Sequence, residues 1–518
     1  MDVEDFHGFK LIESLSFSEE KFQSLVQYTT PSPPIPYDDK IKKAGDAASN
    51  IAKLLTRLNC LTILVEHNYT DRDYKAEFSA FYAKRFCLPS AHCDRLHFFS
   101  KKLPSYGSIT CLNQIKALTD EKSYLGFCVV RPTEFHRIGR TVIKYPEPTS
   151  NQSKTFDVAC RASFTTHLLG QEFKVFGAPF IQQDTQVGAC AHAAVWMVGR
   201  YMHKLGHCGE VSLQQINDFA KSHQTRGRHY PAQDGLVSTQ MLDALHGMGL
   251  FAIYYNNFDT NKLNKRFSTR AQLIGSLIYY YVESGFPVII GLKQHVVVAI
   301  GHTLDSKKEA ANTIERIPSF IIQDDIIGSY LEFPMVGPFK DVIYKPEDII
   351  DLIAVLPNSV HLQGEYAEAF AHVIIDLFAK NSDDSLIQQC KTEAKDSVKF
   401  PSKYRLRTYL LKASDLLVEL QKEATANRAP AVVVDLLLRL NFPQYVWISE
   451  ILSPISDSKE KCIGKLILDS TAAAWDKSLI AILMGKIVFL FDRQHLGLIP
   501  YVKPLETEWE FVPRGFSP

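Results

Sequence analysis

The chain has 518 residues, a length that predicts about three domains rather than a single core. Apolar residues make up 46% of the chain and charged residues 22%, as in ordinary globular proteins that fold in water. Lys plus Arg and Asp plus Glu both total 57, so the formal net charge is zero. This balance argues against a polyanion-binding surface that covers the whole molecule.

The ends of the chain and its cysteines indicate a cytoplasmic protein. Residues 1–24 alternate acidic and apolar side chains, which is not the pattern of a signal peptide. The longest mostly apolar run, 479–491, is interrupted by Lys486 and is too short to span a bilayer. The ten cysteines stand singly, without a Cys-x-x-Cys pair, which fits free thiols better than disulfides or a zinc ribbon. We therefore expect neither membrane nor nucleic-acid partners.

The first part of the chain predicts a helix, a linker and then a mixed α/β domain. Residues 31–37 read Pro-Ser-Pro-Pro-Ile-Pro-Tyr and cannot hold a helix or a central strand, so we assign 1–58 to one N-terminal helix and a Pro-rich linker. Periodicity in the next domain, 59–150, predicts a strand at 61–65, a helix at 71–86, and strands at 96–99, 124–130 and 140–145.

Residues 151–357 predict an α+β domain in which helices precede an antiparallel sheet. A strand-like segment, 156–180, comes first. Helices follow at 191–202, after Ser212, after Ser238 and at 269–283, and strands at 288–292, 295–300 and 320–323. The remaining chain, 358–518, predicts a C-terminal α+β domain with helices at 366–378 and 414–423 and strands at 445–452, 462–468 and 479–491.

A cysteine stands where a polar loop runs into an alanine-rich helix. Residues 182–197 read Gln-Gln-Asp-Thr-Gln-Val-Gly-Ala-Cys-Ala-His-Ala-Ala-Val-Trp-Met, with Cys190 at the junction. A cysteine at a helix N-terminus lies at the positive end of the helix dipole, which favours the reactive thiolate. The alternative is a structural cysteine, because free cysteine is among the most buried residue types.

A histidine opens a strand about midway along the chain. Residues 285–302 read Gly-Phe-Pro-Val-Ile-Ile-Gly-Leu-Lys-Gln-His-Val-Val-Val-Ala-Ile-Gly-His, two apolar runs around a polar turn, which predicts a hairpin. His295 begins its second strand, where the side chain can face an open edge while Val297 and Ala299 point inward. Imidazole is the usual base for a thiol nucleophile, and a structural histidine is the alternative.

Two carboxylates end the next apolar strand. Residues 320–328 read Phe-Ile-Ile-Gln-Asp-Asp-Ile-Ile-Gly. One of the two could accept a hydrogen bond from the second imidazole nitrogen and fix the tautomer of the base. Strand alternation should send Asp324 and Asp325 to opposite faces, so we expect only one of them to reach His295. An aspartate that merely begins a turn is the alternative.

This order of residues resembles the papain-like fold, and most closely the bacteriocin-processing peptidase family and its bacterial relatives. The resemblance spans residues 176–330 and implies Cys190 as nucleophile, His295 as base and Asp324 as the orienting carboxylate. It further implies an upstream glutamine that completes an oxyanion hole. Gln183 is the candidate, and Gln186 is the reserve.

The chain also departs from that family pattern. No glycine follows Cys190, and an insertion rich in Lys and Glu, 305–318, stretches the interval between His295 and the aspartates. The insertion leaves the choice between the two aspartates open, with Asp324 preferred because the family's aspartate directly follows its strand.

The function implied by the resemblance is a cytoplasmic cysteine peptidase that needs no cofactor. It would cleave a peptide or isopeptide bond in a protein or peptide substrate through an acyl-enzyme on Cys190. A thiol acyltransferase or deamidase on the same fold shares the acyl-enzyme and differs in the acceptor. A third hypothesis is a catalytically idle scaffold that binds proteins.

Other polar clusters give weaker signals. His203, His207 and Cys208 could offer metal ligands, but no second cluster completes their site, so we expect no metal. A loop at 223–229 carries two histidines and two arginines and is either solvated or part of the substrate cleft. Neither Gly-x-Gly-x-x-Gly nor a Walker A motif occurs, so no nucleotide cofactor is implied.

Overall fold

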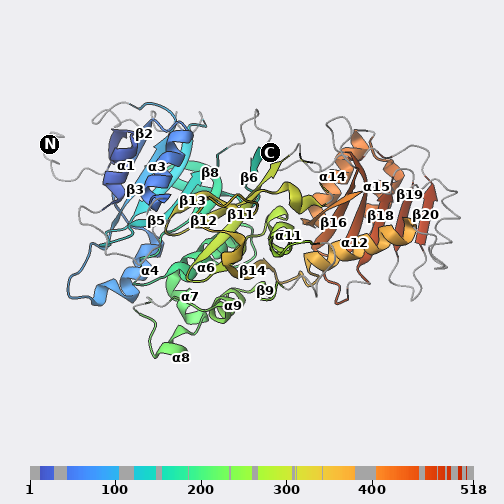
Figure 1. The fold of residues 1–518 in the computed structure, drawn as a ribbon. Coiled ribbons are helices and arrows are strands. Elements are labelled where there is room, and N and C mark those ends of the chain that lie inside the picture. Colours follow the sequence, from blue (N-terminus) through green and yellow to red (C-terminus); the bar gives the residue numbers. More distant parts are fainter. Residues whose placement is uncertain are drawn as a thin grey trace.

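The computed structural model shows three antiparallel sheets that follow one another along the chain, with helices packed on them (Figure 1). This is the predicted α+β class. The structure describes residues 12–27, 44–103, 122–146, 154–258, 267–379, 404–453, 461–491, 500–504, 509 and 511, except for short gaps at 185, 231, 233–234, 306–307, 309, 311, 341, 427, 475–476 and 485–486. The Pro-rich segment 31–37 lies outside these ranges.

The first sheet is built mainly from the N-terminal part of the chain. Its strand order is β1 (Ile12–Ser16), β2 (Thr62–Tyr69), β3 (Cys93–Phe99), β4 (Tyr124–Val130), β5 (Ile138–Lys144), β8 (Gln171–Phe180) and β7 (Ala162–Leu168). Its helices are α1 (Glu19–Val26), α3 (Ala47–Arg57), α4 (Arg72–Ala80) and the 3-10 helix η2 (Tyr82–Lys84). Phe22 of α1 packs edge-on against Phe98 of β3, with ring centroids 5.8 Å apart.

The assignment of 1–58 to one helix and a linker is therefore incomplete. Strand β1 pairs with β2, and α3 buries Ile51, Leu54 and Leu55 in the core. Asp46 caps α3, because its side chain accepts from the Ser49 backbone N–H.

The second sheet forms the middle of the molecule. Its order is β13 (Gly328–Pro334), β12 (Ser319–Asp324), β11 (Val296–Asp305), β10 (Val288–Leu292), β14 (Ile349–Pro357) and β9 (Leu250–Tyr255), and β6 (Lys154–Asp157) pairs with the far end of β11. Its helices are α6 (Cys190–Lys204), α7 (Leu213–Phe219), α8 (Ser222–Arg226), α9 (Ser238–Gly247) and α11 (Arg270–Glu283).

The strands at 156–180 are divided between these two sheets. β6 joins the second sheet, whereas β7 and β8 extend the first sheet beyond β5. The reason is packing, since the ring of Phe173 on β8 lies 5.7 Å from Phe99 and 4.9 Å from Tyr124. The predicted boundary at residues 150/151 therefore does not coincide with the division between the sheets.

The third sheet belongs to the C-terminal part of the chain. Its strands follow chain order: β15 (Arg405–Lys412), β16 (Tyr445–Leu452), β17 (Cys462–Asp469), β18 (Leu479–Met484), β19 (Ile487–Phe491) and β20 (Pro500–Pro504). Helices α12 (Gly364–Ala379), α14 (Ala413–Thr425) and α15 (Ala431–Leu438) pack with it. The prediction of one strand over 479–491 is wrong. The run exceeds the usual strand length of about five to six residues and pairs with itself, Met484 opposite Ile487.

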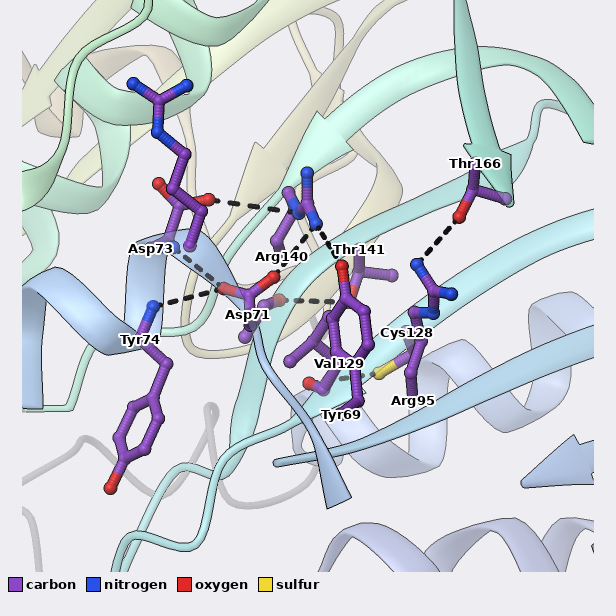
Figure 2. Close-up of polar contacts among 12 residues, drawn as sticks. Tyr69, Asp71, Asp73, Tyr74, Arg95, Cys128, Val129, Arg140, Thr141 and Thr166 are labelled. Carbon is purple, nitrogen blue, oxygen red and sulfur yellow. Dashed lines mark hydrogen bonds and ion pairs between the residues drawn. The ribbon is translucent and has the colours of Figure 1, made fainter. Parts of the chain in front are cut away.

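A buried network of charges ties helix α4 of the N-terminal region to helix α6. Asp71 caps α4 by accepting from the Asp73 and Tyr74 backbone N–H groups, and Arg140 donates to Asp71 Oδ2 at 2.9 Å (Figure 2). Asp73 in turn accepts from the Arg200 guanidinium of α6. The helix that begins at Cys190 is thus anchored to the first sheet's helices.

Within the described part of the chain, no helix combines the length and the apolar character that crossing a membrane requires.

Candidate active site

Cys190 is the first residue of α6, and its side chain is partly exposed. The preceding residue, Ala189, has no polar side chain with which to cap the helix. His192 supplies a cap instead, because its Nδ1 accepts from the Ala189 backbone N–H at 3.3 Å while Nε2 lies 2.9 Å from Asn217 Oδ1. His192 is therefore a buried structural residue, and the remaining N–H groups of the first turn lie beside the thiol.

The loop before Cys190 is shaped by the carboxylate of Asp184. Its Oδ1 accepts from three consecutive backbone N–H groups, those of Gln186, Val187 and Gly188, at 2.9–3.0 Å. Its Oδ2 accepts from the Tyr82 hydroxyl at 2.6 Å. Since Tyr82 belongs to η2, the N-terminal region fixes the conformation of the loop that precedes the cysteine.

A second residue of the N-terminal region, Arg131, holds the start of the same loop. Its Nη2 donates to the Gln182 carbonyl at 2.7 Å, and its Nη1 lies 3.3 Å from Glu77. Both side chains are buried, and burial raises the pKa of Glu77 to about 8. The end of β8 is thus fixed by a buried guanidinium.

His295 lies directly before β11 and closes the predicted hairpin, because its carbonyl accepts from the Leu292 N–H at 2.8 Å. Its Nε2 lies 3.1 Å from Asp324 Oδ1. Burial opposes the charged form of the imidazole, but the Asp324 charge, the Asp324 hydrogen bond and a hydrogen bond with Cys190 outweigh it and raise the pKa of His295 well above its usual value. The histidine therefore contacts both the thiol and a carboxylate.

Asp324 ends β12 with both carboxylate oxygens occupied. Oδ1 also accepts from the backbone N–H groups of Ile326 and Ile327 at 2.9 and 3.1 Å, and Oδ2 accepts from the Tyr344 hydroxyl at 2.7 Å. Burial opposes ionisation, but the His295 charge and these hydrogen bonds prevail and lower the pKa of Asp324. The carboxylate is thus held ionised in a fixed orientation.

Tyr344 is a site residue that sequence reasoning missed. Its ring stacks on the His295 ring at 6.0 Å and on Phe333 at 5.9 Å, while its hydroxyl reaches Asp324. It lies in a loop with no recognisable motif, so no sequence signal identifies it. The ring and the hydroxyl together fix the relative position of imidazole and carboxylate.

The expectation that only one aspartate reaches His295 is wrong. Asp325 Oδ1 lies 3.8 Å from His295 Nε2, only slightly farther than Asp324. Strand alternation does not apply, because β12 ends at Asp324 and Asp325 already belongs to the following turn. Asp324 makes the hydrogen bond, whereas burial and the neighbouring Asp324 charge raise the pKa of Asp325 to about 7.

Helix α3 holds the turn that follows the two aspartates. The Ala47 backbone N–H donates to the Ile326 carbonyl at 3.0 Å, and Asn50 Nδ2 donates to the Ile327 carbonyl at 2.9 Å. The N-terminal region therefore contacts the aspartate turn as well as the cysteine loop.

The two candidate glutamines differ in their surroundings. Gln183 is buried, and its backbone N–H lies near enough to the Asp325 carboxylate to favour ionisation there. Gln186 is partly exposed, and its backbone carbonyl accepts from the Ala232 N–H in the loop before α9 at 2.8 Å. Gln183 is thus the one that adjoins the group around His295.

His295, Asp324 and Asp325 are also the described residues that could hold a metal ion, since one ligand atom of each lies within 4.8 Å of the others. Asp324 already uses both oxygens for hydrogen bonds, and an imidazolium cannot bind a metal. The arrangement of these three residues therefore fits a protonated His295 that contacts two carboxyl groups better than it fits a metal site.

The histidines of the other predicted cluster turn to separate partners. His203 Nδ1 lies 2.9 Å from the Cys208 carbonyl, and His207 Nε2 lies 2.9 Å from the Tyr445 hydroxyl. Burial lowers the pKa of His207 to about 4. These contacts give both residues structural roles.

Comparisons with known proteins identify no family. No family model matches the chain, and no curated protein matches it. Matching solved structures include one described as a double glycine motif protease from an AMS/PCAT transporter in complex with the leader peptide. That structure is 20% identical, with 35% of this chain and 92% of the other covered and a TM-score of 0.21.

Proposed function

We propose that this chain is a papain-like cysteine peptidase with Cys190 as nucleophile, His295 as general base and Asp324 as orienting carboxylate. The observation that carries the proposal is the contact of three side chains from a helix start, a hairpin and a strand end. His295 bonds to Asp324 at 3.1 Å through Nε2, and its ring also bonds to Cys190.

The protonation states of the site support thiol chemistry. A raised pKa of His295 favours the imidazolium, which stabilises a thiolate on Cys190 next to it. The start of α6 adds a positive partial charge on the same side. The thiolate attacks a peptide carbonyl, and the imidazolium protonates the leaving amine. His295 then takes a proton from water, which hydrolyses the thioester and releases the acid product.

Gln183 is our candidate for the oxyanion donor. It is buried, and its backbone N–H adjoins the Asp325 carboxylate beside His295, whereas Gln186 is partly exposed and its backbone bonds to the loop before α9. Loss of one oxyanion donor lowers turnover about 100- to 1000-fold. Gln183→Ala should show that loss and Gln186→Ala should not; the reverse pattern would assign the role to Gln186.

The state of the other cysteines supports a reducing compartment such as the cytoplasm. All eight cysteines that the structure describes are free thiols, and Cys87 is exposed to solvent.

Competitive alkylation tests the proposal within a single molecule. Iodoacetamide is added at pH 6, where an ordinary thiol of pKa about 8.5 is only about 0.3% thiolate. Labelling at each cysteine is then followed by mass spectrometry. We expect Cys190 to react at least tenfold faster than the exposed Cys87, because only Cys190 has an imidazolium partner. His295→Ala should slow labelling at Cys190 and leave labelling at Cys87 unchanged.

Hydrolysis of fluorescent casein by wild type and Cys190→Ala gives the second measurement. The variant should be inactive with an unchanged melting temperature, because the change removes one sulfur from a partly exposed position. Equal labelling of Cys190 and Cys87 would contradict the proposal and favour an idle scaffold. Product masses separate hydrolysis, which adds water, from transfer, which adds the acceptor.

A further inference from the structure

An open pocket of about 510 Å³ lies between the N-terminal region and the loop after α8. One wall comes from the end of α4 and from η2, and the other comes from residues 228–230. The charged and aromatic side chains that line the pocket are Phe81, Lys84, Arg85, Arg228, His229 and Tyr230.

The pocket is basic. Lys84, Arg85 and Arg228 are exposed, and no carboxylate occurs among the described residues that line the pocket. Asp218 Oδ1 lies 3.6 Å from Nε2 of His229, which lines the pocket, and Ser222 Oγ lies 2.7 Å from Nδ1 of the same ring. Three cationic side chains therefore line one concave surface, and the Lys84 ammonium also donates to the Ala80 carbonyl at 2.8 Å.

The pocket also has an apolar wall. The rings of Phe81 and Tyr230 lie 5.9 Å apart and face the same space. Directly after Arg85, Phe86 is fully exposed and Leu88 is 62% exposed. Apolar side chains that lie exposed beside one another are typical of surfaces that bind a partner.

Residues next to each wall of the pocket form hydrogen bonds with the loop that precedes Cys190. Tyr82, next to Phe81, donates to Asp184 at 2.6 Å. Ala232, two residues after Tyr230, donates through its N–H to the Gln186 carbonyl at 2.8 Å. The pocket therefore adjoins the loop that leads into Cys190.

We infer that this pocket is a substrate subsite that binds an acidic side chain of a peptide, with an apolar neighbour of that side chain resting on Phe86 and Leu88. The inference rests on the proposed peptidase function. Arginine pairs with a carboxylate in a planar, bidentate geometry, and two arginines with a lysine give a strong preference for a negative side chain. The aromatic wall fits the methylene groups of glutamate.

Binding of matched peptides to the full-length Cys190→Ala variant tests the inference without cleavage. The probes are fluorescein-labelled Gly-Leu-Glu-Glu-Phe-Gly and Gly-Leu-Gln-Gln-Phe-Gly, followed by fluorescence polarisation at low salt. We expect the glutamate peptide to bind about two- to thirtyfold more tightly, the range given by two exposed ion pairs. Arg85→Glu with Arg228→Glu should abolish this preference, and Arg85→Gln with Arg228→Gln should reduce it.

The matched control is Arg439→Glu with Lys461→Glu, which makes the same change of charge at exposed sites of the C-terminal region. It should keep the preference. Equal binding of the two peptides, or a preference that survives in the Arg85/Arg228 variants, would overturn the inference. Alkylation of Cys190 is independent of this result. If Cys190 is reactive but the two peptides bind equally well, only the subsite inference fails. If the glutamate peptide is preferred but Cys190 is unreactive, only the proposed peptidase function fails.

Discussion

The two regions that flank the central sheet attach to it in different places. The N-terminal region contacts the loop before Cys190 through Tyr82 and Arg131, and it contacts the turn after Asp324 through α3. The C-terminal region contacts the opposite end of the central unit, where α11 packs against α12 and β15.

The C-terminal attachment is a buried cluster of charges. Glu283 at the end of α11 accepts from Arg407 Nε of β15 at 2.8 Å and lies 2.7 Å from His302 Nε2. Burial opposes ionisation of Glu283, but the Arg407 charge and the His302 hydrogen bond lower its pKa to about 2. Arg407 also lies 3.6 Å from Glu450. His302 is seven residues along β11 from His295, so this cluster does not touch the candidate site.

The difference between the attachments predicts separable phenotypes. Breaking N-terminal contacts should change the chemistry of Cys190 together with stability, because those contacts hold the loop and the turn of the site. Breaking C-terminal contacts should change stability while the thiol keeps its reactivity.

The largest effect on the N-terminal side is expected for Asp324, which directly precedes the turn that α3 holds. Asp324→Asn removes the charge that raises the pKa of His295, so turnover should fall about 100- to 10,000-fold. The imidazolium, which protonates the leaving amine, should also be lost at lower pH, and this moves the alkaline limb of the pH–turnover profile to lower pH. Turnover measured between pH 5 and 10 gives both effects.

Asp325→Asn is the matched control for that substitution. Asp325 makes no hydrogen bond to His295, and its pKa of about 7 leaves it largely neutral in mildly acidic solution. Turnover at pH 6 should stay close to wild type. A greater loss in Asp325→Asn than in Asp324→Asn would mean that the wrong carboxylate has been assigned to orient the base.

The largest stability effect is expected on the C-terminal side. Arg407→Ala removes the guanidinium that pairs with buried Glu283 and buried Glu450 and should cost about 3–5 kcal/mol in the free energy of unfolding. Arg439→Ala breaks an exposed pair with Asp435 and should cost only about 0.3–0.5 kcal/mol. Urea unfolding measures both, and alkylation of Cys190 in the folded variants should match wild type.

Acid should weaken this same attachment. Because the pKa of Glu283 is lowered, its contribution to stability is complete above its ordinary pKa of 4.5 and is lost as the pH falls from 4.5 to about 2. Glu283→Gln should be least stable relative to wild type above pH 5 and should approach wild type near pH 2. A stability difference that is independent of pH would contradict the ionised state of Glu283.

A smaller effect is expected for the hydroxyl that supports the cysteine loop. Tyr82→Phe removes the hydroxyl that donates to buried Asp184 Oδ2 and should cost about 1–3 kcal/mol in stability, with slower alkylation of Cys190. Tyr201→Phe removes a comparable hydroxyl, which donates to the Gly285 carbonyl at 2.8 Å away from the loop. It should destabilise the fold without changing the alkylation rate. Equal alkylation in both variants would show that the loop does not depend on η2.

The smallest effect is expected within the central unit itself. Tyr344→Phe keeps the ring that stacks on His295 and removes only the hydroxyl bond to Asp324, so turnover should fall about tenfold. The alkaline limb of the pH–turnover profile should move less than in Asp324→Asn, because the Asp324 charge is retained. This difference tests whether the Tyr344 hydroxyl only positions the carboxylate. Tyr344→Ala, which also removes the stacking ring, should lower turnover further.

The sequence predicted those elements whose periodicity is strong and local. The strand at Tyr124–Val130 has the predicted bounds, and the helix at Arg270–Glu283 begins one residue after the predicted start. The order of Cys190, His295 and Asp324 also predicted that their side chains meet, as they do in the structure. Their catalytic roles remain predictions.

The features that were missed depend on contacts between distant parts of the chain. The pairing of β7 and β8 with the first sheet is decided by packing of Phe173 on Phe99 and Tyr124, which no local pattern encodes. Tyr344 joins the site from a loop, and α3 follows a Pro-rich segment that indicated a linker. Asp325 reaches His295 because the strand ends one residue earlier than the alternation assumed.

The bond between Asn50 and the Ile327 carbonyl has a consequence for biosynthesis, because it joins residues 277 positions apart. At about 5–20 residues per second, a ribosome needs roughly 14–55 s to make the intervening chain. During that interval Cys190 emerges before His295 and before the aspartate turn to which α3 bonds. A nascent chain therefore carries Cys190 without His295, and the candidate site is complete only after synthesis has passed the aspartate turn.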